Sequence, residues 1–337
     1  MPDNPQAQED CTVTILGTGS YLPEKVLTNA DLEEMVDTSD EWISSRTGIR
    51  ERRIAAEDEA TSDLATKAAA NAMEQAGITA DDVELIVVAT TTPDTFFPAT
   101  ACHVQKKLGA TNAICFDVSA ACSGFLYAFQ VARHYLNGSS RKTALVIGAE
   151  KMSAFLNWND RNTCVLFGDG AGAAVLQRNE SPTSRRILST YLGSDGNQTD
   201  ILGVPGGGSA IPITPKNADQ MLNTITMHGR EVYKYAVTAM REAAEIALGR
   251  AGISAAEVAM VIPHQANVRI LDATAERLGI PKERVYINLD KYGNTSAAAV
   301  AIALDEANRD GSIKEGDIVL LIVFGAGLTW GSTLLRW

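Results

Sequence analysis

Cys122 lies in a sequence context that suits a reactive cysteine. It stands in Asp117-Val-Ser-Ala-Ala-Cys-Ser-Gly124, after the apolar stretch 113–118 and before a stretch that favours helix. A cysteine at the N-terminus of a helix lies at the positive end of the helix dipole, which favours the nucleophilic thiolate. A buried structural cysteine is the alternative explanation, and this context alone leaves both open.

His264 and Asn294 are neutral polar residues that could assist such a nucleophile. His264 directly follows the apolar stretch 259–263, and Asn294 lies in Gly293-Asn-Thr-Ser296, before an alanine-rich stretch. Imidazole and amide groups can donate hydrogen bonds to a developing oxyanion. A packing or capping histidine and a helix-capping asparagine are the alternatives.

Two glycine-containing segments lie beside apolar stretches. In Phe324-Gly-Ala-Gly-Leu-Thr-Trp330, small residues after the strand 318–323 can direct backbone N–H groups at an oxyanion, with a tight turn as the alternative. Phe167-Gly-Asp-Gly-Ala-Gly-Ala173 looks like a phosphate loop but lacks the Gly-Lys-Ser/Thr ending and the Rossmann spacing. We therefore do not predict nucleotide binding there.

An internal repeat predicts the elements that position these residues. Residues 68–83 and 243–258 are identical at eight of sixteen positions, and each reads as an alanine-rich helix, a glycine and a short acidic turn. Apolar strands follow at 84–90 and 259–263. Near-continuous apolar strands that alternate with helices indicate parallel sheet covered on both faces, in the α/β class.

A second pair of segments extends the repeat. Residues 121–139 and 294–312 are alanine-rich helical stretches, and the apolar strands 144–148 and 318–324 follow them. We interpret the chain as a duplicated α/β unit. Reactive groups gather beyond the carboxyl ends of parallel strands, so the repeat predicts that the three polar residues meet at like ends of like elements.

The repeat also predicts a division of the chain. We expect a flexible tail at 1–11, an N-terminal half at 12–182 that carries the cysteine, and a C-terminal half at 183–337 that carries the histidine and the asparagine. The join falls where the apolar stretch 173–176 gives way to a polar segment.

Composition excludes several classes of protein. The 337 residues carry a net charge of −12, which argues against a general nucleic-acid binder. No apolar run suits membrane insertion and the N-terminus does not resemble a signal peptide, so we expect a cytoplasmic protein. Five cysteines, an odd number, indicate reduced thiols, and no His/Cys cluster has the spacing of a metal site. We predict no metal and place Cys102, Cys115 and Cys164 in structural roles.

Taken together, the motifs resemble those of the β-ketoacyl-acyl carrier protein synthase III family, whose members have the thiolase fold. The resemblance covers nearly the whole chain. It rests on Asp40-Glu-Trp-Ile-Ser-Ser-Arg-Thr-Gly-Ile-Arg50, Asp117-Val-Ser-Ala-Ala-Cys-Ser-Gly124, Phe167-Gly-Asp-Gly-Ala-Gly172, Pro263-His-Gln-Ala-Asn267, Gly293-Asn-Thr-Ser296 and Gly327-Leu-Thr-Trp-Gly331. It implies two duplicated α/β halves in a layered α-β-α-β-α architecture.

The resemblance also implies a reaction, the decarboxylative condensation of an acyl-CoA primer, acetyl-CoA by default, with malonyl-acyl carrier protein. Cys122 would carry the acyl group, with the backbone N–H groups of Cys122 and Ala326 holding the oxyanion. His264 and Asn294 would stabilise the enolate that forms as CO2 leaves. CoA thioester is then a substrate, and no cofactor is implied. Ala326 stands where the family often has glycine, and we expect this methyl group to be tolerated.

Further residues match the family's binding positions. Those implied for CoA and the carrier protein are Trp42, Arg46, Arg161, Lys234, Asn267 and Arg269. Arg277 would extend a basic patch for the acidic carrier protein, although Glu276 stands where the family often has a basic residue. Phe97 matches the residue that closes the acyl pocket of the partner in a homodimer.

Four other functions fit part of this pattern. A papain-like thiol hydrolase also uses Cys, His and Asn in this order, but in a different local sequence. A degradative thiolase would need a second cysteine in the C-terminal half, and the last cysteine is Cys164. A non-catalytic partner subunit would usually lack one of the three residues. A related condensing enzyme of secondary metabolism, with another acyl primer, stays open.

Overall fold

The computed structural model describes residues 12–179 and 185–337. The strands are β1 (Thr12–Tyr21), β2 (Lys25–Thr28), β3 (Glu51–Ile54), β4 (Leu85–Ala89), β5 (Ile114–Val118), β6 (Thr143–Glu150), β7 (Gly170–Asn179), β8 (Arg186–Ser194), β9 (Leu202–Gly203), β10 (Thr226–Met227), β11 (Met260–Pro263), β12 (Ile318–Gly325) and β13 (Thr329–Arg336). The α-helices are α1 (Asn29–Glu33), α2 (Asp40–Thr47), α3 (Thr61–Ala76), α4 (Thr100–Leu108), α5 (Gly124–Asn137), α6 (Gly229–Ala251), α7 (Val268–Leu278), α8 (Leu289–Tyr292) and α9 (Ala298–Arg309).

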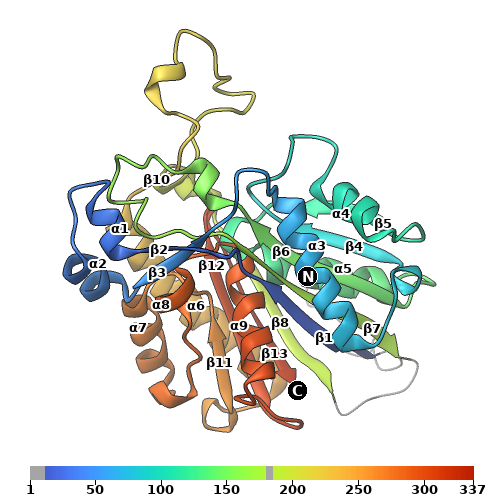
Figure 1. Cartoon of the computed structure of the whole chain (residues 1–337). Helices are drawn as coiled ribbons and strands as arrows, with labels where there is room; N and C mark the ends of the chain where they lie inside the picture. Colours follow the sequence, from blue (N-terminus) through green and yellow to red (C-terminus); the bar gives the residue numbers. More distant parts are fainter. Residues whose placement is uncertain (1–11, 180–184) are drawn as a thin grey trace.

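Two sheets sandwich a pair of central helices. One sheet has the order β1-β7-β6-β4-β5 and the other the order β11-β12-β13-β8. Helices α5 and α9 pack between the sheets, α3 and α4 cover the outer face of the first, and α6 with α7 covers the second (Figure 1). This arrangement confirms the predicted α-β-α-β-α layering.

The sequence repeat is also a structural repeat. Helices α3 and α6 end at Gly77 and Gly252, which adopt left-handed conformations with φ of 68° and 65°. Glycine enters this region without the penalty that a Cβ atom imposes. After each glycine comes a short 3-10 turn, and then β4 or β11. Both copies therefore present the carboxyl end of a buried strand to the same side of the molecule.

The predicted parallel pairing is present, but both sheets also contain antiparallel strands. Strand β4 pairs in parallel with β5 and β6, and β11 pairs in parallel with β12. Strand β7 is antiparallel to β6 and β1, and β13 is antiparallel to β12 and β8. A parallel connection needs a crossover of a dozen or more residues, whereas only the turn 326–328 joins β12 to β13.

The two halves share one core. Apolar side chains of both sheets and both central helices form a single buried cluster, which includes Leu85, Phe125, Leu304 and Leu321. The predicted boundary between 182 and 183 lies in 180–184, outside the described residues, as does the predicted tail 1–11. The division into halves at that point stays a prediction.

Two further features of the fold concern its surface. The segment between β9 and β10 protrudes from the body beside the ends of the central strands (Figure 1). Within 12–179 and 185–337, no helix has the length and the apolar character that crossing a membrane requires.

Candidate active site

Cys122, His264 and Asn294 meet at one cavity. Cys122 lies in a 3-10 turn (Ala121–Ser123) that leads into α5, His264 follows β11, and Asn294 precedes α9. All three line a cavity of about 750 Å³. Strand ends that are far apart in the sequence thus bring a thiol, an imidazole and an amide together, as the repeat predicts.

Cys122 is held as a buried thiol at the start of α5. Only 8% of the residue is exposed. Burial, the largest influence, raises the pKa of the Cys122 thiol to about 11, and the charge of Glu150 acts in the same direction. Hydrogen bonds from Ser296 and Asn294 lower this pKa. The position at the start of α5 favours the thiolate, but burial acts in the opposite direction and raises the pKa of the thiol.

His264 is a neutral imidazole in this site. Its backbone N–H donates to the carbonyl of Ile322 at 2.7 Å, which fixes the residue at the end of β11. Burial lowers the pKa of His264 to about 4. The side chain is therefore uncharged at neutral pH, and its Nδ1 atom is buried without a hydrogen-bond partner in the part of the chain that the structure describes.

Backbone contacts fix the Asn294 amide. The backbone N–H of Asn294 donates to the carbonyl of Leu166 at 2.8 Å. Its side-chain Oδ1 accepts from the backbone N–H of Ser296 at 2.8 Å. Since a backbone N–H can only donate, this bond assigns Oδ1 to the turn and leaves the side-chain NH₂ group for other partners. Asn294 can therefore act as a hydrogen-bond donor in the cavity.

The turn after β12 lies against the N-terminus of α5. A Cβ atom on Gly325 would lie 2.7 Å from the backbone nitrogen of Cys122, so this approach requires glycine. The hydroxyl of Thr329 lies within hydrogen-bond distance of the carbonyls of Ala120 and Ala326, at 3.1 and 3.0 Å, and can donate its one proton to either. These bonds hold the Ala326 loop beside the cysteine.

Cys122 also lines a second, smaller cavity of about 190 Å³, together with Ala326. Its further lining residues are Thr91, Thr92, Ala121, Met152, Phe155, Phe167, Leu202, Gly203, Val204, Ile225 and Ser296. No common sequence pattern marks these lining residues, because they come from several separate loops and strands. This cavity is small, and most of the side chains that line it are apolar.

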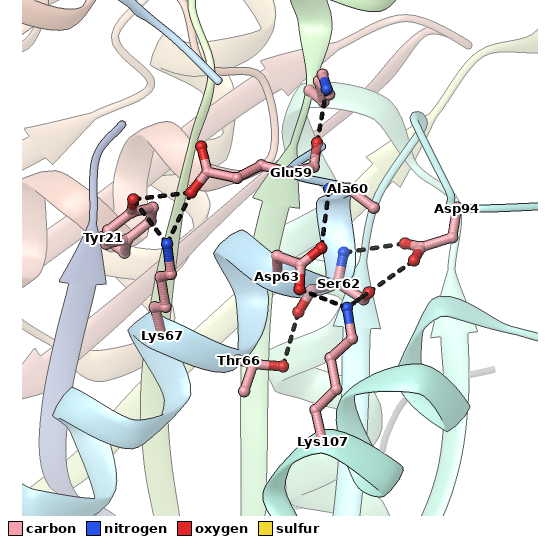
Figure 2. A network of polar contacts seen from close by, with 10 residues as sticks. Tyr21, Glu59, Ala60, Ser62, Asp63, Thr66, Lys67, Asp94 and Lys107 are labelled. Carbon is pink, nitrogen blue, oxygen red and sulfur yellow. Dashed lines mark hydrogen bonds and ion pairs between the residues drawn. The ribbon is translucent and has the colours of Figure 1, made fainter. Parts of the chain in front are cut away.

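Phe97 is not among the residues that line the two cavities. Phe96 and Phe97 are each 85% exposed, at the tip of the loop between β4 and α4. Figure 2 shows how this loop is anchored at its base: the Asp94 carboxylate accepts from the backbone N–H of Ser62 at 2.9 Å and from its hydroxyl at 2.6 Å. Lys107 bonds to the same hydroxyl at 2.6 Å. A fixed loop therefore presents two phenyl rings outward.

Four of the predicted binding residues line the mouth of the large cavity, namely Trp42, Arg46, Asn267 and Arg269. Helices α2 and α7 meet there. The Asn267 amide donates to the carbonyl of Arg46 at 3.1 Å, and the Arg269 guanidinium donates to the carbonyl of Ser45 at 3.0 Å. Two hydrogen bonds thus join α2 to the start of α7 beside the cavity.

The other two predicted binding residues lie outside this lining. Arg161 lies over the Trp42 ring at 5.3 Å, and Arg46 lies over the same ring at 4.6 Å. Lys234 is exposed on α6. Arg230 at the start of α6 does line the cavity, although the sequence analysis did not single it out. Several guanidinium groups therefore lie at the large cavity, although the net charge of the protein is negative.

Glu150 is another residue that the sequence analysis missed. It is fully buried at the carboxyl end of β6, and its charge acts on Cys122. The rule that reactive groups gather at strand ends would have identified it, had it been applied to the strand 144–148 as well.

The duplicated α/β fold, with a cysteine, a histidine and an asparagine at one cavity, is typical of the thiolase-like condensing enzymes. The family described as 3-oxoacyl-[acyl-carrier-protein (ACP)] synthase III matches residues 116–196, and its C-terminal counterpart matches residues 248–337. A β-ketoacyl-[acyl-carrier-protein] synthase III of Caldanaerobacter subterraneus subsp. tengcongensis is 56% identical over 329 residues, 98% of this chain and 99% of the relative. The chain belongs to the β-ketoacyl-[acyl-carrier-protein] synthase III family.

Solved structures agree with this assignment. The crystal structure of 3-oxoacyl-[acyl-carrier-protein] synthase III from Aquifex aeolicus VF5 has a TM-score of 0.89 and 49% identity, with 96% of this chain and 100% of that chain covered. The priming β-ketosynthase of the R1128 polyketide pathway has the same TM-score of 0.89 but 35% identity, over 97% of both chains. These likenesses exclude the papain-like thiol hydrolase.

Proposed function

We propose that the protein condenses an acyl-CoA primer, acetyl-CoA by default, with malonyl-acyl carrier protein, and so initiates fatty-acid synthesis. The products are 3-ketoacyl-acyl carrier protein, CoA and CO2. The observation that carries this proposal is the meeting of Cys122, His264 and Asn294 in one cavity whose mouth is lined by Trp42 and Arg269. The chain is 56% and 49% identical to two β-ketoacyl-[acyl-carrier-protein] synthase III proteins but 35% identical to the polyketide enzyme, which favours this function over a role in secondary metabolism.

In the first half-reaction, Cys122 takes the acyl group. The sulfur attacks the thioester carbonyl, and the backbone N–H groups of Cys122 and Ala326 stabilise the tetrahedral oxyanion. The thioester bond to CoA breaks, and the proton of the cysteine thiol leaves with CoA as its thiol. The cavity of about 190 Å³ beside Cys122 supports a short acyl group as the primer.

In the second half-reaction, His264 and Asn294 stabilise the enolate. As the malonyl group loses CO2, negative charge builds on the thioester oxygen. Hydrogen bonds from two neutral donors stabilise this charge, whereas a carboxylate at the same place would repel it. Because the Nδ1 atom of His264 is buried, the Nε2 atom is the nitrogen left for the substrate. The enolate carbon then attacks the acyl-cysteine, and the cysteine sulfur leaves and regains a proton.

The mouth of the cavity would hold the CoA portion and the carrier protein. Trp42 and Arg161 would bracket the adenine, and Arg46 and Asn267 would line the path of the pantetheine arm. Lys234 and Arg269 would attract the acidic carrier protein. The chemistry needs no metal and no further cofactor, because the thiol supplies the nucleophile and the thioesters supply the carbon.

We place the protein in the cytoplasm as a homodimer. The outward position of Phe97 supports the dimer, since an 85% exposed phenyl ring gains most by burial in a partner subunit. In such a dimer, Phe97 would close the acyl pocket of the partner.

The proposal is tested by intact-protein mass spectrometry followed by a condensation assay. Purified protein mixed with acetyl-CoA is expected to gain an acetyl group on Cys122, and malonyl-acyl carrier protein should then release CO2 and remove that group. Longer and branched acyl-CoAs rank the primers in the same experiment. If no acyl-CoA labels the protein and no CO2 appears with malonyl-acyl carrier protein, the proposed function is wrong.

Arg269→Glu is expected to impair carrier-protein use more than acyl-CoA use. The exposed guanidinium lies at the cavity mouth, where charge reversal repels an acidic partner. The KM for malonyl-acyl carrier protein should rise about tenfold, which corresponds to ~1.4 kcal/mol, with a smaller change for acetyl-CoA. Lys314→Glu is the matched control, because it changes the net charge equally at an exposed site outside the cavity lining. Equal changes in both KM values would contradict carrier docking at Arg269.

A further inference from the structure

Glu150 is a buried carboxylate beside the active site that the proposed mechanism does not use. It is the last residue of β6 and has no exposed surface. Burying an ionised carboxylate costs several kcal/mol unless hydrogen bonds replace its water. Glu150 takes part in none of the ion pairs found among the described residues, so hydrogen-bond donors must compensate its charge.

The loop after β4 supplies most of these donors. The backbone N–H groups of Thr91 and Thr92 each donate to the carboxylate at 3.1 Å. The hydroxyls of Thr92 and Thr90 donate at 2.7 and 3.1 Å. Backbone N–H groups can only donate, and they favour the ionised form, although burial raises the pKa of Glu150. The carboxylate is therefore held by a rigid set of donors on this side.

On its other side Glu150 reaches the turn that carries Asn294. The Ser296 hydroxyl donates to the carboxylate at 3.0 Å, and the backbone N–H of Ala297 lies 3.5 Å from the same oxygen. Strand β6 and this turn belong to different halves of the chain. Glu150 therefore connects the loop that lines the acyl cavity with the start of α9.

Ser296 adopts a conformation that needs such support. Its φ is 50°, in the left-handed region that residues with a Cβ atom rarely enter. In this conformation its backbone N–H donates to Oδ1 of Asn294 at 2.8 Å, and that bond turns the asparagine NH₂ group away from the turn. The orientation of the Asn294 amide thus depends on a strained residue whose hydroxyl is held by Glu150.

Glu150 also acts on the nucleophile through its charge. Its carboxylate raises the pKa of Cys122, whereas hydrogen bonds from Ser296 and Asn294 lower it. A serine hydroxyl has one proton, so a Ser296 that donates to Glu150 cannot donate to the sulfur at the same time. His264, which lines the cavity together with Cys122, is neutral at pH 7. The other titratable side chains of this lining are those of Arg46, Arg230, Tyr233 and Arg269.

We propose that Glu150 is a positioning residue, whose buried carboxylate holds the Ser296 hydroxyl and thereby orients the Asn294 amide toward the malonyl thioester. This inference rests on the proposed role of Asn294 as an enolate-stabilising donor. Glu150 does not contact the substrate. Its removal should affect the step that needs the oriented amide, and should also release the Ser296 hydroxyl toward the sulfur.

The first test is Glu150→Gln, which keeps the size of the side chain but removes its charge and turns one acceptor into an NH₂ group. The kcat for malonyl decarboxylation should fall about 10- to 100-fold, with the KM for malonyl-acyl carrier protein nearly unchanged. Alkylation of Cys122 by iodoacetamide, followed against pH, should shift to lower pH by about one unit, a tenfold faster reaction at pH 7.5. A wild-type decarboxylation rate, or an unshifted alkylation profile, would overturn the proposal.

A second variant separates positioning from loss of stability. Ser296→Ala removes the hydroxyl that Glu150 holds, so it should lower decarboxylation as well, and the double variant should be no slower than the slower single variant. Additive losses would mean that Glu150 acts independently of Ser296 and would reject the mechanism. This comparison stays decisive even if Glu150→Gln alone folds poorly, because Ser296→Ala at the wild-type rate rejects the mechanism too.

Two controls make the result specific. Asp305→Asn changes another buried carboxylate, which is 1% exposed and accepts hydrogen bonds from the hydroxyls of Thr18 and Ser20. Asp305 lines neither cavity. This variant should therefore lower the melting temperature without shifting the pH profile of Cys122 alkylation. Asn294→Ala tests the function on which the inference rests. If Asn294→Ala blocks decarboxylation and Glu150→Gln does not, only the inference about Glu150 fails; if neither does, the proposed role of Asn294 fails.

Discussion

Replacement of Cys122 by serine is expected to abolish formation of the acyl-enzyme, with acylation slower by about four orders of magnitude or more. A serine hydroxyl is a far weaker nucleophile than a thiol unless a neighbouring base removes its proton. The one imidazole at this cavity, that of His264, has a pKa lowered to about 4 and is therefore a poor base. Burial of position 122, which is 8% exposed, opposes formation of an alkoxide as it opposes a thiolate.

Intact-protein mass spectrometry after mixing with acetyl-CoA measures this effect directly. Cys102→Ser is the matched control, because Cys102 is a free, half-buried cysteine on α4 that lines neither cavity. The control should acquire the acetyl group at the wild-type rate. A Cys122→Ser protein that is labelled as fast as the wild type would refute the assignment of the nucleophile.

Replacement of His264 or Asn294 by alanine is expected to block malonyl decarboxylation while acylation of Cys122 continues. Each variant removes a donor to the thioester oxygen, and loss of one such donor typically costs about 10²- to 10³-fold in rate. The first half-reaction is expected to persist, because its oxyanion is held by backbone N–H groups that these substitutions leave in place. Acylation should therefore change much less than decarboxylation.

The two half-reactions can be measured separately. Release of CO2 from malonyl-acyl carrier protein reports the decarboxylation, and the mass gain with acetyl-CoA reports the acylation. His103→Ala is a suitable control, because His103 lies on α4 and lines neither of the two cavities. Equal losses in both half-reactions would reject the division of roles between the cysteine and the two donors.

Much of the fold could be predicted because the chain carries one pattern twice. The helix-glycine-strand unit around Gly77 recurs around Gly252, and the structure forms the same elements at both places. Strand direction was predicted less well. A buried strand does not reveal its direction: β7 and β13 are largely buried, as β6 and β12 are, yet they run antiparallel to those strands. For β13, the short turn 326–328 decides the direction, because it leaves no room for a crossover.

The sequence also predicted only some of the residues that line the large cavity. Trp42, Arg46, Asn267 and Arg269 line the cavity mouth as the family resemblance implies, whereas Arg161 and Lys234 lie outside its lining. Arg230 lines the cavity but belongs to no motif that singled it out. Whether a surface arginine faces a cavity depends on the packing of its helix, which sequence periodicity describes only approximately.

The sequence by itself determined which residues could do the chemistry and that they would share one end of the molecule. Cys122, His264 and Asn294 each follow a strand or begin a helix, and the duplication places those positions together. Tertiary structure alone decided their chemical state. The raised pKa of Cys122, the lowered pKa of His264 and the contact of Glu150 with Ser296, 146 residues away, arise from burial and from partners distant in the chain. Desolvation depends on everything packed around a group, so no local pattern of residues encodes it.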